Sequence, residues 1–107
     1  REDMFEKLDG EGLRGGITWL VPNAQKNLME PILLTLGPGG RTDEFPAHSG
    51  EEFGYVLSGR AVLAAGDARY TLRRGESFCL HPDAPHHIEN PGPGTARLIW
   101  ASAPPSF

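Results

Sequence analysis

Three residues with metal-ligating side chains, His48, Glu52 and His86, each lie at a short, regular distance from a turn glycine. His48 and Glu52 belong to a segment that runs from Gly40 to Gly59, and His86 belongs to a segment that runs from Gly75 to Asn90. Two imidazoles and one carboxylate carried on separate strands can converge on one cation and leave coordination positions open for water or a substrate. The pattern therefore predicts a site for a divalent metal: Fe, Mn, Ni or Zn.

Adjacent histidines and glutamates compete for the interior positions of these segments. Neighbouring residues of a strand face opposite sides of a sheet, so only one residue of each adjacent pair can serve an interior site. The spacing favours Glu52 over Glu51, and the same rule leaves one imidazole of His86 and His87 inside and the other outside or at the rim. Asn90 is expected to end a strand or to support the ligands from behind, because a turn-forming residue is typical before a proline.

The elements that must position these residues are short strands. Fourteen glycines and ten prolines leave little room for a long helix, so the sequence predicts an all-β sandwich or barrel of seven or eight strands. The expected strands are residues 16–21, 31–36, 53–57, 60–65, 68–72, 76–80, 86–89 and 96–101. Residues 1–16 are expected to form an N-terminal arm with at most one helical turn over Asp3–Leu8, and residues 17–107 the barrel domain.

Composition excludes several classes of protein. A net charge of −4 lacks the basic footprint of a domain that grips nucleic acid, and the apolar runs are too short to span a bilayer. The single cysteine, Cys79, permits no internal disulfide and indicates a reducing, cytoplasmic compartment. Its apolar neighbours suggest a small buried hydrophobe. The first residue is Arg1 rather than methionine, which suggests that a further segment lies upstream.

The two glycine-bounded segments together resemble the two sequence motifs of the cupin superfamily. The resemblance covers roughly residues 29–103 and implies a double-stranded β-helix, which is the jelly-roll or cupin barrel. It also implies that the metal ligands are motif residues. The positions that match the first motif are Gly40, His48, Glu52 and Gly59, and those that match the second are Gly75, His86 and Asn90.

Two departures from the motifs bear on metal binding. Pro46 stands where the family has the first histidine, so one of the four ligands typical of the family is missing. His81 and Asp83 replace the proline and the glycine of the second motif. The remaining trio of two histidines and one carboxylate suits iron(II), but a degenerate site without metal is an equally open interpretation.

Other segments are similar to the C-terminal cupin domain of bacterial helix-turn-helix regulators of the Xre type. These are Met29–Pro31, Gly50–Gly59, Gly75–Phe78 and Ala103–Phe107. In that family the cupin domain is implied to sense an effector and to dimerise, while a separate N-terminal domain binds DNA. The expected function is therefore effector sensing, with a small molecule in the barrel interior and no direct contact between this segment and nucleic acid.

Catalysis is not required by this interpretation, but an enzyme remains the alternative. A stand-alone metal-dependent cupin enzyme of the dioxygenase or isomerase type would use the same open coordination positions. A barrel of structural or storage type without a ligand is a third possibility. Besides the trio, Arg60, His81 and Arg97 are the candidates for contact with an effector or substrate.

A homodimer is expected from the outward side chains of one strand. Phe53, Tyr55 and Leu57 alternate with inward positions and would form an apolar stripe on the outer face of a sheet. Such a stripe is commonly covered by a partner barrel.

Overall fold

The structure is a computed structural model that describes residues 6–7, 15–21, 28–105 and 107. Every regular element in these ranges is a strand, and none of the described residues forms a helix that could cross a membrane. The strands are β1 (Glu6–Lys7), β2 (Gly15–Trp19), β3 (Glu30–Leu36), β4 (Glu51–Ser58), β5 (Arg60–Ala65), β6 (Ala68–Arg73), β7 (Ser77–Leu80), β8 (His86–Glu89) and β9 (Ala96–Ala103). The predicted all-β class is confirmed.

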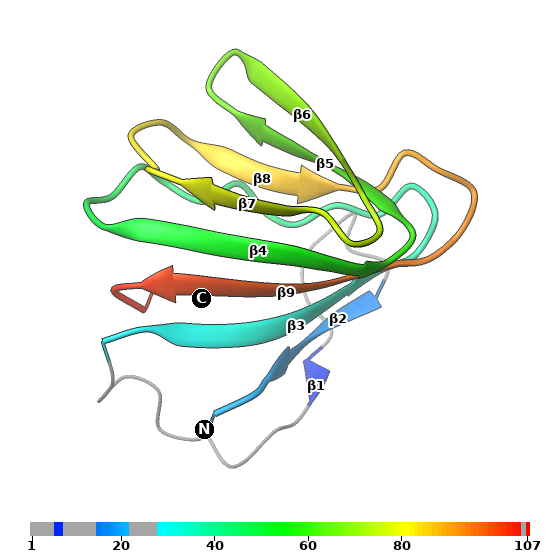
Figure 1. The fold of residues 1–107 in the computed structure, drawn as a ribbon, viewed down its shortest axis with the longest axis horizontal. Helices are drawn as coiled ribbons and strands as arrows, with labels where there is room; N and C mark the ends of the chain where they lie inside the picture. Colours follow the sequence, from blue (N-terminus) through cyan, green and yellow to red (C-terminus); the bar gives the residue numbers. More distant parts are fainter. Residues whose placement is uncertain (1–5, 8–14, 22–27, 106) are drawn as a thin grey trace.

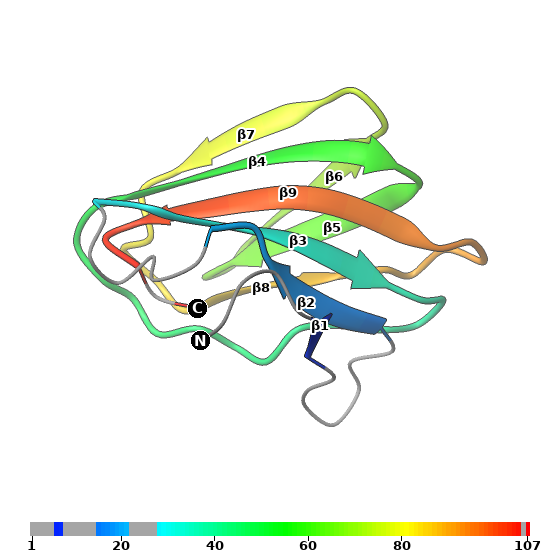
Figure 2. The same cartoon turned by 90° about the horizontal axis from the view of Figure 1, so that it is seen from below.

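The strands form two antiparallel sheets that face each other, as Figures 1 and 2 show. The larger sheet has the order β1-β2-β3-β9-β4-β7, and the smaller sheet has the order β6-β5-β8. The last strand, β9, lies between β3 and β4, so the chain crosses between distant elements as a jelly roll requires. One side chain of every two therefore points into the space between the sheets.

The core follows from this alternation. Ile32, Leu34 and Leu36 of β3 are fully buried, while the residues between them are only partly so. On β4 the inward residues are Glu52, Gly54 and Val56. Each buried aliphatic side chain stabilises the fold by roughly 1.5–3 kcal/mol relative to exposure. The remaining fully buried apolar side chains are Ala61, Ile88, Ala96, Leu98 and Trp100.

The start of β4 and the end of β9 each extend beyond the predicted strand. β4 begins at Glu51 and β9 continues to Ala103, because these two residues pair with each other and extend the ladder. Of Asp3–Leu8, for which at most one helical turn or an arm is expected, the structure describes Glu6 and Lys7, which pair with Thr18 and Ile17 of β2. The rest of that stretch lies outside the described residues.

The prediction that Cys79 is buried is also wrong. Cys79 is exposed on β7, while Phe78 and Leu80 on either side of it are half-buried. An apolar run of four residues reads as uniformly buried, but a strand presents alternate residues to opposite faces and puts the thiol outside.

Candidate metal centre and adjoining cleft

The structure brings together the three residues that the spacing singled out. The Oε2 atom of Glu52 lies 2.8 Å from Nε2 of His48 and 2.9 Å from Nε2 of His86. The three candidate ligand atoms all lie within 4.8 Å of one another. Glu52 and His86 are buried and His48 is partly so. This cluster of His48, Glu52 and His86, called the metal centre, could hold one metal ion.

Local backbone geometry explains how the chain brings these side chains together. Gly50, at the reversal between His48 and Glu52, has φ of 108°, a conformation that favours glycine. A Cβ atom at Gly50 would overlap the carbonyl oxygen of Ala103. The loop before it is tied down by a 2.8 Å bond from the His48 amide to the Pro82 carbonyl. The reversal thus delivers His48 from a loop beside Glu52 on β4.

Both histidines are held in the tautomer that a metal ligand needs. The Nδ1 atom of His48 donates to the Ser49 carbonyl at 2.7 Å, and Nδ1 of His86 donates to the Ala84 carbonyl at 3.0 Å. A carbonyl can only accept, so the hydrogen is on Nδ1 and Nε2 points at the centre. Metal-binding histidines are commonly oriented by such a bond on the second nitrogen. The residues therefore fit a divalent ion.

The centre requires positive charge. With Nδ1 protonated, the lone pairs of two Nε2 atoms and of the Glu52 carboxylate converge and repel one another unless a metal ion or protons lie between them. Burial works against the charged form of the His48 ring. The Ser49 carbonyl and the Glu52 carboxylate outweigh burial, so the pKa of His48 is raised above its ordinary value of 6.5. Protons and a metal ion thus compete for the same ring nitrogen.

The other oxygen of Glu52 is held from a neighbouring strand. Nε1 of Trp100, on β9, donates a 2.8 Å hydrogen bond to Oε1 of Glu52, and both side chains are buried. The bond leaves Oε2 free to face the two histidines. Sequence reasoning missed this residue, although a tryptophan at a central strand position signals a need for a buried acceptor.

Aromatic side chains line the side of the centre behind His86. The ring of Phe45 lies 6.1 Å from the ring of His86 and 5.4 Å from that of Trp100, the second contact edge-on. Phe107 packs edge-on against both Phe45 and Trp100 at 5.8 and 4.8 Å. Phe45 and Trp100 thus lie against the His86 ring, and Phe107 packs against these two rings. Phe45 and Phe107 were also missed from the sequence.

The expected division within each adjacent pair agrees with the structure. Glu51 is exposed, while Glu52 is 1% exposed. His87 faces away from the centre, and its Nε2 atom lies 2.7 Å from Oε1 of Glu89. Asn90 is no ligand here: its buried Nδ2 atom donates to the carbonyls of three residues, Leu36, Gly37 and Gly94. It fastens two loops together at the end of β8.

The other candidate binding residues lie away from the metal centre. The side chain of His81 is 71% exposed, with Nδ1 3.7 Å from a carboxylate oxygen of Glu51. Arg60 is exposed at the start of β5, and Arg97 is exposed on β9. Effector contact by any of these three residues stays a prediction, and such contact would not be made inside the barrel.

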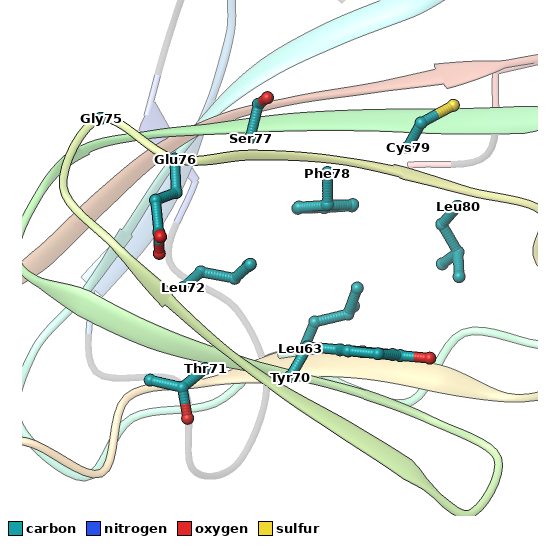
Figure 3. Close-up of a pocket in the computed structure, with 10 residues that line it drawn as sticks. All are labelled: Leu63, Tyr70, Thr71, Leu72, Gly75, Glu76, Ser77, Phe78, Cys79 and Leu80. Atoms are coloured by element: carbon teal, nitrogen blue, oxygen red, sulfur yellow. The ribbon is translucent and has the colours of Figure 1, made fainter.

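A cleft opens beside the centre between β6 and β7, the adjacent edge strands of the two sheets (Figure 3). It encloses about 680 Å³. Phe78 and Leu80 line it from β7 and face Leu63 and Leu72 of the smaller sheet, with Tyr70 at its rim. Thr71, Glu76 and Ser77 also line the cleft, so its wall is partly polar. Leu80 is the cross-strand partner of Glu52, so this end of the cleft lies near the metal centre. The volume is in the range of small-molecule sites.

A family of known proteins matches the barrel part of this chain. The family model described as "Cupin domain" matches residues 32–102. Among curated proteins, the HTH-type transcriptional regulator PuuR of Escherichia coli (strain K12) is 36% identical over 108 residues, which cover 100% of this chain and 56% of that protein. The chain thus spans about half the length of this relative.

Solved structures with the same fold include a regulator domain and a predicted enzyme. The Cupin_2 domain of an XRE family transcriptional regulator from Enterobacter cloacae is similar with a TM-score of 0.72 and 19% identity, over 81% of this chain and 93% of that one. A predicted oxalate decarboxylase from Thermotoga maritima is similar with a TM-score of 0.75 and 18% identity, over 94% and 91% of the two chains. At these identities the likeness establishes the fold alone.

Proposed function

The chain belongs to the cupin domain family, and on that basis we propose that it is the effector-sensing domain of a bacterial helix-turn-helix transcriptional regulator that acts in the cytoplasm. Identity of 36% to a regulator along the whole chain supports this role over others that the fold serves. In this proposal DNA is bound by another part of the longer protein, and the barrel reports whether a small molecule is present.

The observation that carries the proposal is the position of the metal centre near a cleft that offers both apolar and polar surface. A divalent ion held by His48, Glu52 and His86 would supply open coordination positions to oxygen or nitrogen atoms of an effector. Within the protein itself, Ser49 and Ala84 orient the two imidazoles and Trp100 orients the carboxylate. In this proposal the polar end of the effector binds at the metal centre.

The apolar portion of the effector binds in the cleft between β6 and β7. Leu63, Phe78 and Leu80 offer it apolar surface, and the hydroxyl of Tyr70 offers one polar contact at the rim. Burial of apolar ligand surface there contributes about 25 cal/mol per Å² before the costs of association. The matching ligand is a small molecule with a chelating end and an apolar portion.

The same open coordination positions would suit a metal-dependent oxygenase or isomerase, which is the competing function. The two functions differ in the fate of the bound ligand. An enzyme consumes its ligand, whereas a sensor binds it reversibly and changes the affinity of the full-length protein for DNA.

The test uses the full-length protein and its own promoter DNA. We expect the full-length protein to carry a helix-turn-helix segment before Arg1. We expect Co²⁺ to change the affinity of that protein for the promoter DNA in a gel-shift assay. His86→Ala should abolish the Co²⁺ effect while DNA binding persists, and His81→Ala, an exposed histidine outside the centre, should leave the effect intact. A full-length protein without a DNA-binding segment would overturn the proposal.

A further inference from the structure

Three arginines line a second cavity, of about 430 Å³, at the end of the barrel away from the metal centre. They are Arg60 at the start of β5 and Arg73 and Arg74 at the β6–β7 turn, and the loop Gly92–Gly94 lies beside them. We propose that this cavity, the arginine site, binds a small multivalent oxyanion such as a phosphate ester or a polycarboxylate.

The arginine site is separate from the metal centre. Arg60 begins β5, whereas Ala65 at the other end of β5 pairs with His86. Five residues of strand span about 17 Å. A ligand at one site therefore makes no contact with the other.

The register of the smaller sheet forces like charges together. Arg60 on β5 is directly opposite Arg73 on β6, and Arg74 follows immediately. Like charges directly opposite each other destabilise a sheet. The chain as a whole has 14 acidic and only 10 basic residues besides histidine, so this concentration of positive charge runs against its composition. An anion in the cavity would relieve the repulsion.

The carboxylates of Glu76 and Glu89 do not pair with the three guanidinium groups. Oε2 of Glu89 accepts from Arg69 at 2.7 Å and its Oε1 atom lies 2.7 Å from Nε2 of His87, so both oxygens are used. Oε1 of Glu76 accepts from the backbone amide of Arg73 at 2.7 Å. Within the described part of the chain no carboxylate forms an ion pair with the guanidinium of Arg60, Arg73 or Arg74. Their donors are available to a ligand.

The loop beside the arginines is fixed in place by a buried amide. Asn90 is 2% exposed; its Nδ2 atom donates to the Gly94 carbonyl at 2.7 Å, and its Oδ1 atom accepts from the Gly92 amide at 3.0 Å. A Cβ added at Gly92 would lie 3.5 Å from Nη2 of Arg60, so that guanidinium lies against the loop. The cavity has a preformed side, which reduces the entropy lost on binding.

The chemistry of the side chains defines the ligand class. A guanidinium presents a planar fork of donors that matches a carboxylate or a phosphate, and two such forks with a third beside them suit more than one negative charge. The cavity volume is that of a small-metabolite site. The occupant is therefore a compact oxyanion and not an apolar molecule.

The experiment is an NMR titration of the ¹⁵N-labelled chain with inorganic phosphate and, separately, with citrate, at ionic strength held constant with chloride. We expect saturable shifts at the amides of Gly59, Gly92 and Gly94. Arg60→Gln and Arg73→Gln should each weaken binding about tenfold, the loss of one charge-assisted hydrogen bond. Arg69→Gln is the matched control because Arg69 is on β6, the strand of Arg73, but is paired with Glu89. This variant should bind phosphate and citrate as the parent chain does.

Several results would overturn the inference. Shifts that do not saturate, or that chloride reproduces, would mean that the arginines are only solvated. Equal losses in Arg60→Gln and Arg69→Gln would mean a diffuse charge effect. A DNA duplex that displaces phosphate at lower concentration than citrate does would make the ligand a nucleic-acid backbone and not a small molecule. Unchanged Co²⁺ binding in Arg60→Gln would verify that the variant is folded.

Discussion

The indole of Trp100 on β9 and the carboxylate of Glu52 on β4 form a buried 2.8 Å hydrogen bond between neighbouring strands. Trp100 is directly opposite Gly54, two residues along β4 from Glu52, so the bond runs diagonally across the inner face of the sheet. It occupies Oε1 and turns Oε2 toward both histidines. Trp100 thus orients a candidate metal ligand without being a ligand itself.

Replacement of Trp100 by phenylalanine should therefore weaken metal binding without removing a ligand. The variant keeps an aromatic ring against Phe45 and Phe107 but leaves Oε1 of Glu52 buried without its donor. We expect Co²⁺ affinity, measured by absorbance titration, to fall about 10–100-fold. Urea unfolding should show a loss of about 1–3 kcal/mol in the free energy of unfolding from the unsatisfied oxygen, in addition to the loss of ring volume.

Trp19→Phe is the control for that experiment. Trp19 is also buried in the core, but it lies on β2, which β3 and β9 separate from β4. The control should lose stability and keep its Co²⁺ affinity. Equal Co²⁺ affinities in Trp100→Phe and Trp19→Phe would show that the indole hydrogen bond does not position Glu52.

Metal affinity should rise with pH through a midpoint above the ordinary histidine value of about 6.5. The Glu52 carboxylate and the Ser49 carbonyl raise the folded pKa of His48 despite burial, and the ring must lose a proton from Nε2 to bind a metal. Isothermal titration calorimetry with Co²⁺ over a pH range that brackets this value would measure the midpoint. A midpoint at or below the ordinary value would contradict the raised pKa.

The stability of the metal-free chain should fall as the pH rises, whereas the metal affinity should increase. A raised folded pKa means that the protonated His48 ring stabilises the fold, fully so below the unfolded pKa of about 6.5. That contribution is lost as the pH rises through the raised folded pKa. The urea midpoint of the parent should therefore fall over this interval more than that of His48→Gln, which carries no titrating ring.

The outer face of β4 should mediate a homodimer. Phe53, Tyr55 and Leu57 are 47, 38 and 40% exposed, and Ile99 of β9 is the cross-strand neighbour of Tyr55 on that face. Apolar stripes of this kind are commonly covered by a second copy. Light scattering at micromolar concentration should give a dimer mass for the parent chain and a monomer mass for Phe53→Glu.

Tyr70→Glu is the matched control for dimerisation. Tyr70 is 52% exposed but lies at the rim of the β6–β7 cleft on the other sheet, so its substitution should leave the dimer intact. A monomeric parent, or a dimer unaffected by Phe53→Glu, would show that the β4 face is solvent-exposed in solution.

Local rules are enough to place several residues of the site from the sequence. Side chains alternate along a strand, so the choice of Glu52 over Glu51 needs only the strand and the spacing to a turn glycine, and only one of His86 and His87 can face the interior. The same rule identifies the buried face of β3 and the exposed stripe on β4. These features depend only on residues that are close together in the chain.

Strand pairing between distant segments was decided only in the tertiary structure. Nothing local brings β9 between β3 and β4, yet that order places Trp100 beside Glu52 and Phe107 beside Phe45. The edge position of β7 opens the cleft, and the β5–β6 register sets Arg60 against Arg73. The sequence determined which residues can do chemistry. Long-range packing decided which of them meet, because register and strand order are set by the burial of the whole core and not by any one segment.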